Sequence, residues 1–95
     1  MLDFEWNEKK AESNLIKHGI RFEDCVSVFD DKVGIYIFDE KHSIVESRFI
    51  LIGNNNQEST MVISYTIRNN KIRIISCRTA SKNERKRYEE KNKNN

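Results

Sequence analysis

Hydrophobic residues near the start of the chain first alternate with polar ones and then recur at helical spacing. Phe4 and Trp6 flank Glu5, a pattern that predicts a short strand with one apolar face. Asn7 is a typical helix cap, and Gly19 suits the left-handed residue that closes a helix. We therefore expect the first helix to lie between these two residues.

The next apolar residues predict a second helix. Phe22, Cys25, Val26 and Phe29 recur at spacings of three and four residues, which is the stripe that an amphipathic helix turns toward a core. We expect this helix to end at the polar segment 30–32.

Four strands are expected after it, because β-branched and aromatic residues gather in segments 33–38, 48–53, 60–68 and 71–79. Segment 54–57 is an expected turn, and Asn69-Asn70 tolerates the positive φ angles of a tight hairpin. The hairpin register is then predicted as Arg68 opposite Lys71, Ile67 opposite Ile72, Thr66 opposite Arg73, and Tyr65 opposite Ile74.

This register separates two faces of the expected sheet. The predicted core face carries Met61, Ile63, Tyr65, Ile67, Ile72 and Ile74. The opposite, basic face carries Ser64, Thr66, Arg68, Lys71 and Arg73, with Ile75 and Cys77 further along. A slip of one residue in the register would invert the assignment.

The last expected helix begins at Ser81. Ser81 and Glu84 have the spacing of a capping box, and Tyr88 follows on the same helix, where it can reach back toward the sheet. The fold predicted for residues 1–90 is a single α+β domain with two N-terminal helices, an antiparallel meander of about four strands and a C-terminal helix. Residues 91–95, which are Lys and Asn only, are expected to be a flexible basic tail.

Composition supports one folded domain. The chain has 95 residues, of which 37% are hydrophobic and 34% charged, and its apolar residues fall into periodic runs. No run approaches the roughly 20 apolar residues of a membrane helix, and acidic residues near the N-terminus argue against a secretion signal, so we expect a cytoplasmic protein. Cys25 and Cys77 lie far apart without metal-ligand spacing, and we expect buried free thiols.

Charge is distributed unevenly along the chain. The net charge is only +2, but residues 71–95 contain nine Lys or Arg and three Glu. A basic end on a mildly acidic body is typical of a face that meets phosphates. A solvated, charged terminal helix would give the same asymmetry, and composition alone does not separate an enzyme that cuts RNA from a module that binds it.

Several short motifs, in the same order along residues 4–89, resemble the BrnT toxins of bacterial type II toxin–antitoxin systems. They are Phe4-Glu5-Trp6-Asn7-Glu8, Asn14-Leu15-x-Lys17-His18-Gly19-Ile20, Phe22-Glu23 with Val28-Phe29-x-Asp31, Glu46-x-Arg48, Ile72-Arg73-Ile74-Ile75-Ser76-x-Arg78, and Glu84-Arg85-x-x-Tyr88-Glu89. The chain departs from the pattern at Lys32, where a proline is common, and at Cys77, where a small residue is usual.

The resemblance implies a small RelE-like ribonuclease that inhibits translation and growth. It also implies a BrnA-type ribbon-helix-helix antitoxin as partner, in a heterotetramer built around an antitoxin dimer. Operator DNA would be bound only through the antitoxin. The helix and strand order predicted above agrees with this fold.

Cutting RNA without a metal requires a base, an acid and fixed cations at the phosphate where charge develops. Arginine suits the last role, because its planar fork donates two bonds and keeps its charge. We expect Arg48, Arg73 and Arg78 to form a phosphate clamp. Strand periodicity places Arg73 and Arg78 on opposite faces unless the strand bends between them.

The candidates for proton transfer are Glu46, His18, Tyr88 and Lys17, and no cofactor or metal is expected. Three of them have a structural alternative: His18 as a helix-end group, Tyr88 as an aromatic at the edge of the core, and Glu46 as an ion partner of Arg48. Further RNA contacts are expected from Lys17, Arg68, Lys71, Lys82 and Arg85. The arginines could also serve a catalytically silent binding module, or act only as ion pairs that stabilise the fold.

Overall fold

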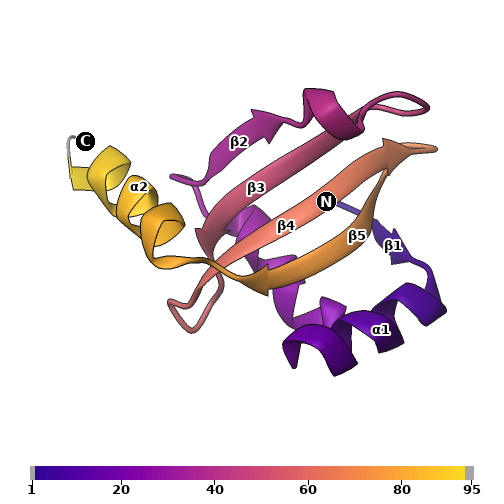
Figure 1. Cartoon of the computed structure of the whole chain (residues 1–95), viewed down its shortest axis with the longest axis horizontal. Coiled ribbons are helices and arrows are strands. Elements are labelled where there is room, and N and C mark those ends of the chain that lie inside the picture. Colours follow the sequence, from indigo (N-terminus) through magenta and orange to yellow (C-terminus); the bar gives the residue numbers. More distant parts are fainter. Residues whose placement is uncertain (1, 94–95) are drawn as a thin grey trace.

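The structure is a computed structural model that describes residues 2–93. A five-stranded sheet has a short 3-10 helix behind it and an α-helix at each flank (Figure 1). The elements in chain order are β1 (Phe4–Trp6), α1 (Glu8–His18), η1 (Phe22–Asp30), β2 (Ile35–Phe38), η2 (Glu40–His42), β3 (Arg48–Asn54), β4 (Thr60–Arg68), β5 (Lys71–Thr79) and α2 (Lys82–Lys93). The α+β fold predicted from the sequence is confirmed.

The sheet has the strand order β1-β5-β4-β3-β2. Strands β2 to β5 form the predicted antiparallel meander. The N-terminal strand β1 adds to it as a fifth strand, parallel to β5, with Glu5 opposite Arg73. This pairing joins the first strand of the chain to the last one and places Phe4 and Trp6 against the core.

Helix α1 has the predicted caps. The Asn7 side chain accepts a hydrogen bond from the Lys10 amide at 3.1 Å. Gly19 adopts a left-handed φ of 69°, and its amide donates to the Leu15 carbonyl at 2.8 Å. These bonds satisfy backbone groups that a helix leaves unpaired at its two ends.

The second helix, η1, is a 3-10 helix, whereas the apolar spacing is typical of an α-helix. Its fully buried residues are Phe22, Cys25 and Val28, which are spaced by three. That spacing matches the three residues per turn of a 3-10 helix. Val26 and Phe29, the other members of the predicted stripe, are only partly buried.

The β4–β5 hairpin has the predicted register, with Arg68 opposite Lys71 and Thr66 opposite Arg73. Asn69 and Asn70 supply the positive φ angles of its turn, at 53° and 64°. Two-residue turns of this kind match the twist of the strands that they join.

A β-bulge then changes the faces of β5. Ser64 pairs with Ser76, but the next residue of β4, Tyr65, pairs with Ile74, so that Ile75 is the extra residue. Beyond the bulge the side chains exchange faces. Cys77 is buried in the core, and its predicted place on the basic face is wrong, because that prediction assumed an unbroken period of two.

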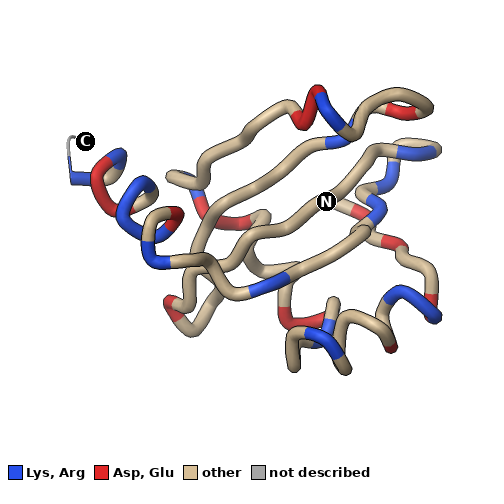
Figure 2. The backbone as a smooth tube through the Cα atoms, in the orientation of Figure 1, with Lys and Arg blue, Asp and Glu red and all other residues tan. Residues whose placement is uncertain are grey.

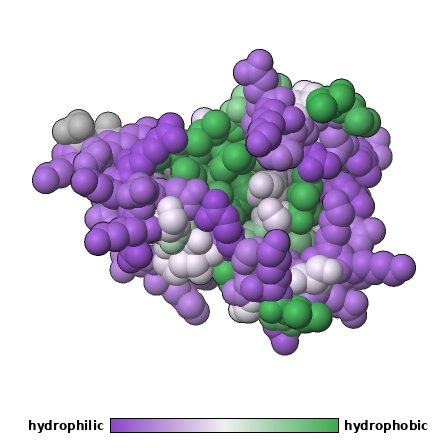
Figure 3. All heavy atoms as spheres, in the orientation of Figure 1, coloured by the Kyte–Doolittle hydropathy of each residue, from purple (hydrophilic) through white to green (hydrophobic). Residues whose placement is uncertain are grey.

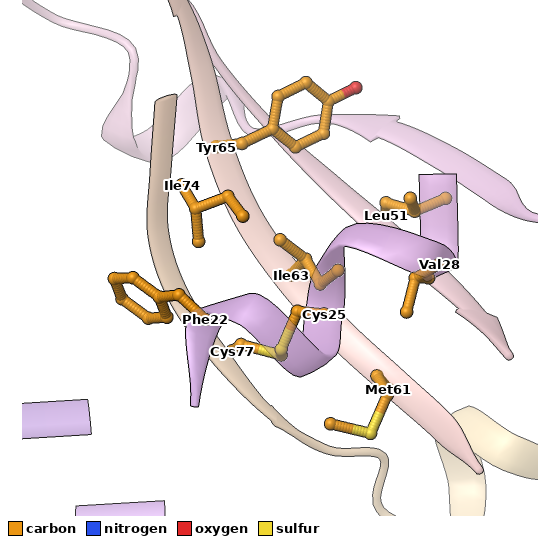
Figure 4. Packing of buried hydrophobic residues seen from close by; sticks show 9 residues of the cluster. All are labelled: Phe22, Cys25, Val28, Leu51, Met61, Ile63, Tyr65, Ile74 and Cys77. Carbon is orange, nitrogen blue, oxygen red and sulfur yellow. A yellow bond between two sulfur atoms is a disulfide. The ribbon is translucent and has the colours of Figure 1, made fainter. Parts of the chain in front are cut away.

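The main core lies between the sheet and η1 (Figure 4). Phe22, Leu51, Ile63 and Ile74 are buried there almost completely. Within it, Cys25 of η1 and Cys77 of β5 form a disulfide, so the two cysteines are buried as expected but are not free thiols. The cross-link joins residues that are 52 positions apart, and sequence spacing did not indicate that the fold would bring them together.

Asn14 of α1 completes the edge of β5 beyond the end of β1. Its side chain accepts a hydrogen bond from the Cys77 amide at 3.0 Å and donates to the Cys77 carbonyl at 2.8 Å. It also donates to the Ile20 carbonyl at 3.0 Å. A single buried amide therefore pairs the backbone groups that a neighbouring strand would otherwise pair.

Helix α2 packs on the face of the sheet opposite η1. Ser81 and Glu84 form the predicted capping box, through bonds of 2.8 and 3.2 Å. Tyr88 packs in a second apolar cluster with Ile35, Ile52, Val62 and Ala80. The helix continues to Lys93, so the first residues of the expected tail are helical, and Asn94 and Asn95 lie outside the described residues. In the described part of the chain no helix is long and apolar enough to cross a membrane.

Candidate functional site

The face of the sheet opposite η1 carries a row of polar residues across four strands. Thr66 of β4 lies opposite both Arg48 of β3 and Arg73 of β5, and Arg73 lies opposite Glu5 of β1. Residues that lie opposite one another point to the same face. We call this face the open face, and Glu5, Arg73, Thr66 and Arg48 the arginine row.

Arg73 is held by the carboxylate of Glu5. Its Nη1 donates to Glu5 Oε2 at 2.7 Å, and both side chains are about one quarter exposed. The parallel pairing of β1 with β5 makes this contact across 68 positions of sequence. Sequence reasoning missed Glu5 as a site residue, although its polar side chain between two core aromatics already pointed away from the core.

At the other end of the row, Glu46 holds two arginines. Arg68 donates to the Glu46 carboxylate at 2.9 Å, and Arg48 lies 3.8 Å from its second oxygen. The hydrogen bond from Arg68 lowers the pKa of Glu46 below its ordinary value, and the same bond raises the pKa of Arg68. Glu46 is therefore ionised at neutral pH.

Arg48 keeps an unused donor. Its Nε is buried and has no hydrogen-bond partner among the described residues. The backbone around it is fixed, because the Arg48 amide donates to Ser43 Oγ at 2.9 Å. Thr66, which is 2% exposed, donates to the Ser47 carbonyl at 2.6 Å beside it. The guanidinium is thus positioned by the strand, and its side chain, which is 33% exposed, can reach a ligand through its terminal nitrogens.

Arg78 shares the open face but lies apart from the row. The bulge at Ile75 brings Arg78 to the same face as Arg73. An unbroken strand would have placed the two arginines on opposite faces. Arg78 lies opposite Val62, four residues along β4 from Thr66, or roughly 13 Å at the usual rise of a strand. The clamp predicted from sequence is divided: Arg48 and Arg73 are brought together, and Arg78 is not.

Arg78 instead fastens α2 to the sheet. Its two terminal nitrogens donate to the two oxygens of Glu84 at 2.7 and 2.8 Å. This fork, with the bonds of Glu84 to Ser81, lowers the pKa of Glu84 to about 2. Bidentate pairs of this geometry are stronger than single ion pairs.

His18 and Lys17 lie beside the open face, at the outer edge of β5. Together with Ile75 and Ser76 of β5 they line a shallow recess of about 180 Å³. In the described part of the chain, no hydrogen bond or ion pair joins either side chain to the arginine row. Their contribution would require a substrate that extends from the row across Ser76.

Tyr88 is not brought to the row. Its hydroxyl donates to Asp31 Oδ2 at 2.5 Å beneath α2. Burial and this bond raise the pKa of Tyr88 to about 12. Asp31 also accepts from the amides of Asn54 and Val33, and these bonds outweigh the effect of burial, so its pKa is lowered.

The remaining candidate RNA contacts are spread over the molecule (Figure 2). Arg68 and Lys71 lie at the β4–β5 hairpin, near the row, and Lys71 is exposed. Lys82 and Arg85 are exposed on α2, at the far end of the open face. Between the two basic ends, the open face shows an apolar floor that includes Ile37 and Ile50 (Figure 3).

Comparison with known families decides the relationship. Residues 6–84 match the model of the family described as the ribonuclease toxin, BrnT, of type II toxin–antitoxin systems. The chain belongs to the BrnT family. The matched range includes Arg48, Arg73 and Arg78 but ends before Tyr88. Among curated proteins, none matches this chain.

A solved BrnT structure has the same fold. The crystal structure at 1.1 Å resolution of the Brucella abortus ribonuclease toxin BrnT is similar to this chain with a TM-score of 0.67 and 21% sequence identity. The similarity covers 86% of this chain and 100% of that one. The BrnT-like architecture therefore holds at low sequence identity.

The arginine row is suited to holding an anion. Two guanidinium groups on one row offer donors on either side of Thr66, and a carboxylate stands at each end. A phosphate placed between the guanidinium groups would replace carboxylate oxygens as their acceptor. The displaced carboxylates would then lie beside the bound group, where each can accept a proton.

Proposed function

We propose that this chain is the ribonuclease toxin of a type II toxin–antitoxin module and that it cuts RNA at the arginine row. The observation that carries the proposal is the juxtaposition of Arg48 and Arg73 across Thr66, in a chain of a ribonuclease toxin family. Cleavage of cellular RNA in the cytoplasm would stop translation and growth.

The chemistry we propose is attack of a ribose 2′-hydroxyl on the neighbouring phosphate. The new bond from the 2′-oxygen to phosphorus gives a 2′,3′-cyclic phosphate, and the bond to the 5′-oxygen of the next nucleotide breaks. Arg48 and Arg73 stabilise the negative charge that develops on the phosphate oxygens, and this requires no metal or cofactor. Glu46 is the best placed of the predicted proton acceptors, because it is ionised and lies between Arg48 and Arg68. The departing 5′-oxygen takes a proton from water, and His18, at the outer edge of β5 and away from the row, would contribute only to an RNA that extends across Ser76.

The partner that we propose is a BrnA-type ribbon-helix-helix antitoxin, in a heterotetramer built around an antitoxin dimer. Arg48 and Arg73 of the row, and Arg78 where α2 is fastened to the sheet, are each paired with a carboxylate in the isolated chain. An acidic antitoxin segment that occupied the row would present the same acceptors and would exclude RNA.

The same carboxylate pairs favour a second candidate function, a catalytically silent module. In that case the arginines would bind RNA or an acidic antitoxin segment, and no bond would be broken. The two candidates differ only in whether a product forms, which makes them separable by a single assay.

The test uses purified protein, RNA and a chelator, with a parallel reaction that contains translating ribosomes. Wild type is compared with Arg48→Ala, Arg73→Ala and a matched control, Arg87→Ala, which removes an exposed arginine from α2. We expect wild type and Arg87→Ala to cleave RNA at the same rate. The cleavage rate of the row variants should be lower by about 100-fold or more.

Each other outcome has a distinct meaning. RNA binding without product in both reactions would support the silent module. Equal cleavage by wild type and by folded row variants would place the active site elsewhere. A large decrease in the melting temperature of the row variants would show that these arginines stabilise the fold through their ion pairs.

A further inference from the structure

The loop between η2 and β3, residues 43–47, holds two apolar side chains in solvent beside the arginine row. Ile44 is 90% exposed and Val45 is 97% exposed. The loop is anchored at both ends, through Ser43 and through the bond from Thr66 to the Ser47 carbonyl. The ends of the loop are thus held to the sheet, and the two apolar side chains lie between them.

The two side chains form one wall of a recess of about 450 Å³. The recess is lined by Lys41, His42, Ile44, Val45, Glu46 and Arg48. Its size is within the range of small-molecule sites. Figure 3 shows a hydrophobic patch over this loop, separate from the apolar floor of the open face.

The other walls of the recess are polar and mainly basic. Arg48 lines the recess with a side chain that is 33% exposed, and Lys41 is exposed. Glu46, the acidic residue of the lining, is paired with Arg48 and Arg68. His42 is hydrogen-bonded through Nδ1 to Asp39 at 2.9 Å, which fixes its ring at the rim. The recess therefore joins an apolar surface to Arg48, which is a member of the arginine row.

We propose that this recess receives the nucleobase that flanks the scissile phosphate, so that loop 43–47 sets the base preference of RNA cleavage. The proposal rests on the proposed function. A nucleotide combines a flat ring with apolar faces and an anionic phosphate, and the recess places Ile44 and Val45 beside Arg48. Bases contribute affinity through contact of their faces with protein side chains, while phosphates are held by cations.

Binding and cutting are tested separately. The probes are 2′-O-methyl oligonucleotides, which lack the nucleophile, and a matched oligonucleotide with an abasic position at the expected flanking site. Wild type is compared with Ile44→Ser/Val45→Ser and with a control, Ile16→Ser, which replaces an apolar side chain that is 86% exposed on α1. These side chains are in solvent, and the substitutions leave the core intact.

We expect the loop variant to bind the base-containing probe about 5-fold more weakly than wild type, as for the loss of apolar contact with one base. Its affinity for the abasic probe should equal that of wild type, and Ile16→Ser should bind both probes normally. With cleavable RNA, the loop variant should cut more slowly and lose preference at one position beside the cleaved bond.

Equal affinity of wild type and loop variant for the base-containing probe would overturn the inference, as would equal losses with both probes. So would a loop variant that binds both probes normally but no longer binds antitoxin, since the recess would then be a protein-docking surface. Absence of cleavage by wild type would reject the proposed function and leave the binding comparison to decide the inference.

Discussion

Arg48 of β3 and Arg73 of β5 lie opposite the same residue, Thr66, and so stand on one row of the sheet. The two arginines are 25 positions apart in the sequence, and each is held by a carboxylate from outside the hairpin. The row is therefore a product of the meander and of the added strand β1. Its geometry depends on the sheet, which makes the stability of the sheet a condition for activity.

Asn14 is expected to be a main support of this geometry. Asn14→Ala would leave the amide and carbonyl of Cys77 buried without partners, at a cost of about 3 kcal/mol in the free energy of unfolding. Urea unfolding measures the loss, and Ser13→Ala, an exposed change on the same helix, is the control. A loss below about 0.5 kcal/mol would show that water replaces the amide.

The disulfide between Cys25 and Cys77 should make stability depend on reduction. Reducing it is expected to lower the free energy of unfolding by about 2–4 kcal/mol, mainly because the unfolded chain gains conformational entropy without the cross-link. The measurement is thermal unfolding with and without dithiothreitol, with intact mass to count free thiols. The Cys25→Ala/Cys77→Ala variant should have the same low melting temperature with and without dithiothreitol. A wild type whose melting temperature is equal under both conditions would contradict the cross-link.

The pair of Arg78 and Glu84 should give an acid-dependent contribution to stability. The pKa of Glu84 is about 2 in the folded chain, against an ordinary value of 4.5, so its contribution is complete above pH 4.5 and is lost as the pH falls toward 2. Since the pair is partly exposed, we expect only about 1 kcal/mol. The free energies of unfolding of wild type and Glu84→Gln, measured from pH 7 to pH 2, should differ by a constant amount above pH 4.5 and nearly converge at pH 2. A difference that stays constant down to pH 2 would refute the assignment.

Local patterns predicted much of this fold. Asn7 and Gly19 marked the ends of α1, Ser81 and Glu84 marked the start of α2, and Asn69-Asn70 fixed the hairpin register. In each case the signal is a residue whose own chemistry closes an element. Such signals depend on a few neighbouring positions and are therefore visible without the tertiary structure.

Features that depend on packing were not predicted. No residue in Ile74-Ile75-Ser76 marks a bulge, and this alone moved Cys77 into the core and Arg78 onto the open face. The spacing of Phe22, Cys25 and Val28 fits an α-helix nearly as well as a 3-10 helix. The disulfide and the contact of Glu5 with Arg73 join distant segments, which local patterns do not specify.

The candidate site shows the same division. Sequence reasoning selected Arg48, Arg73, Glu46 and Arg68, and the fold brings them together. It also selected His18 and Tyr88 by residue type, and the fold places both away from the row, because the position of a helix on a sheet is set by packing. Their proposed roles remain predictions.

The most direct test of the central claim is a controlled induction of this chain in a bacterium, with Arg48→Ala/Arg73→Ala beside wild type at matched soluble expression. Growth and total RNA are followed after induction. We predict growth arrest with loss of RNA in wild type alone. Normal growth and intact RNA in wild type, or arrest by both proteins alike, would contradict a ribonuclease whose site is the arginine row.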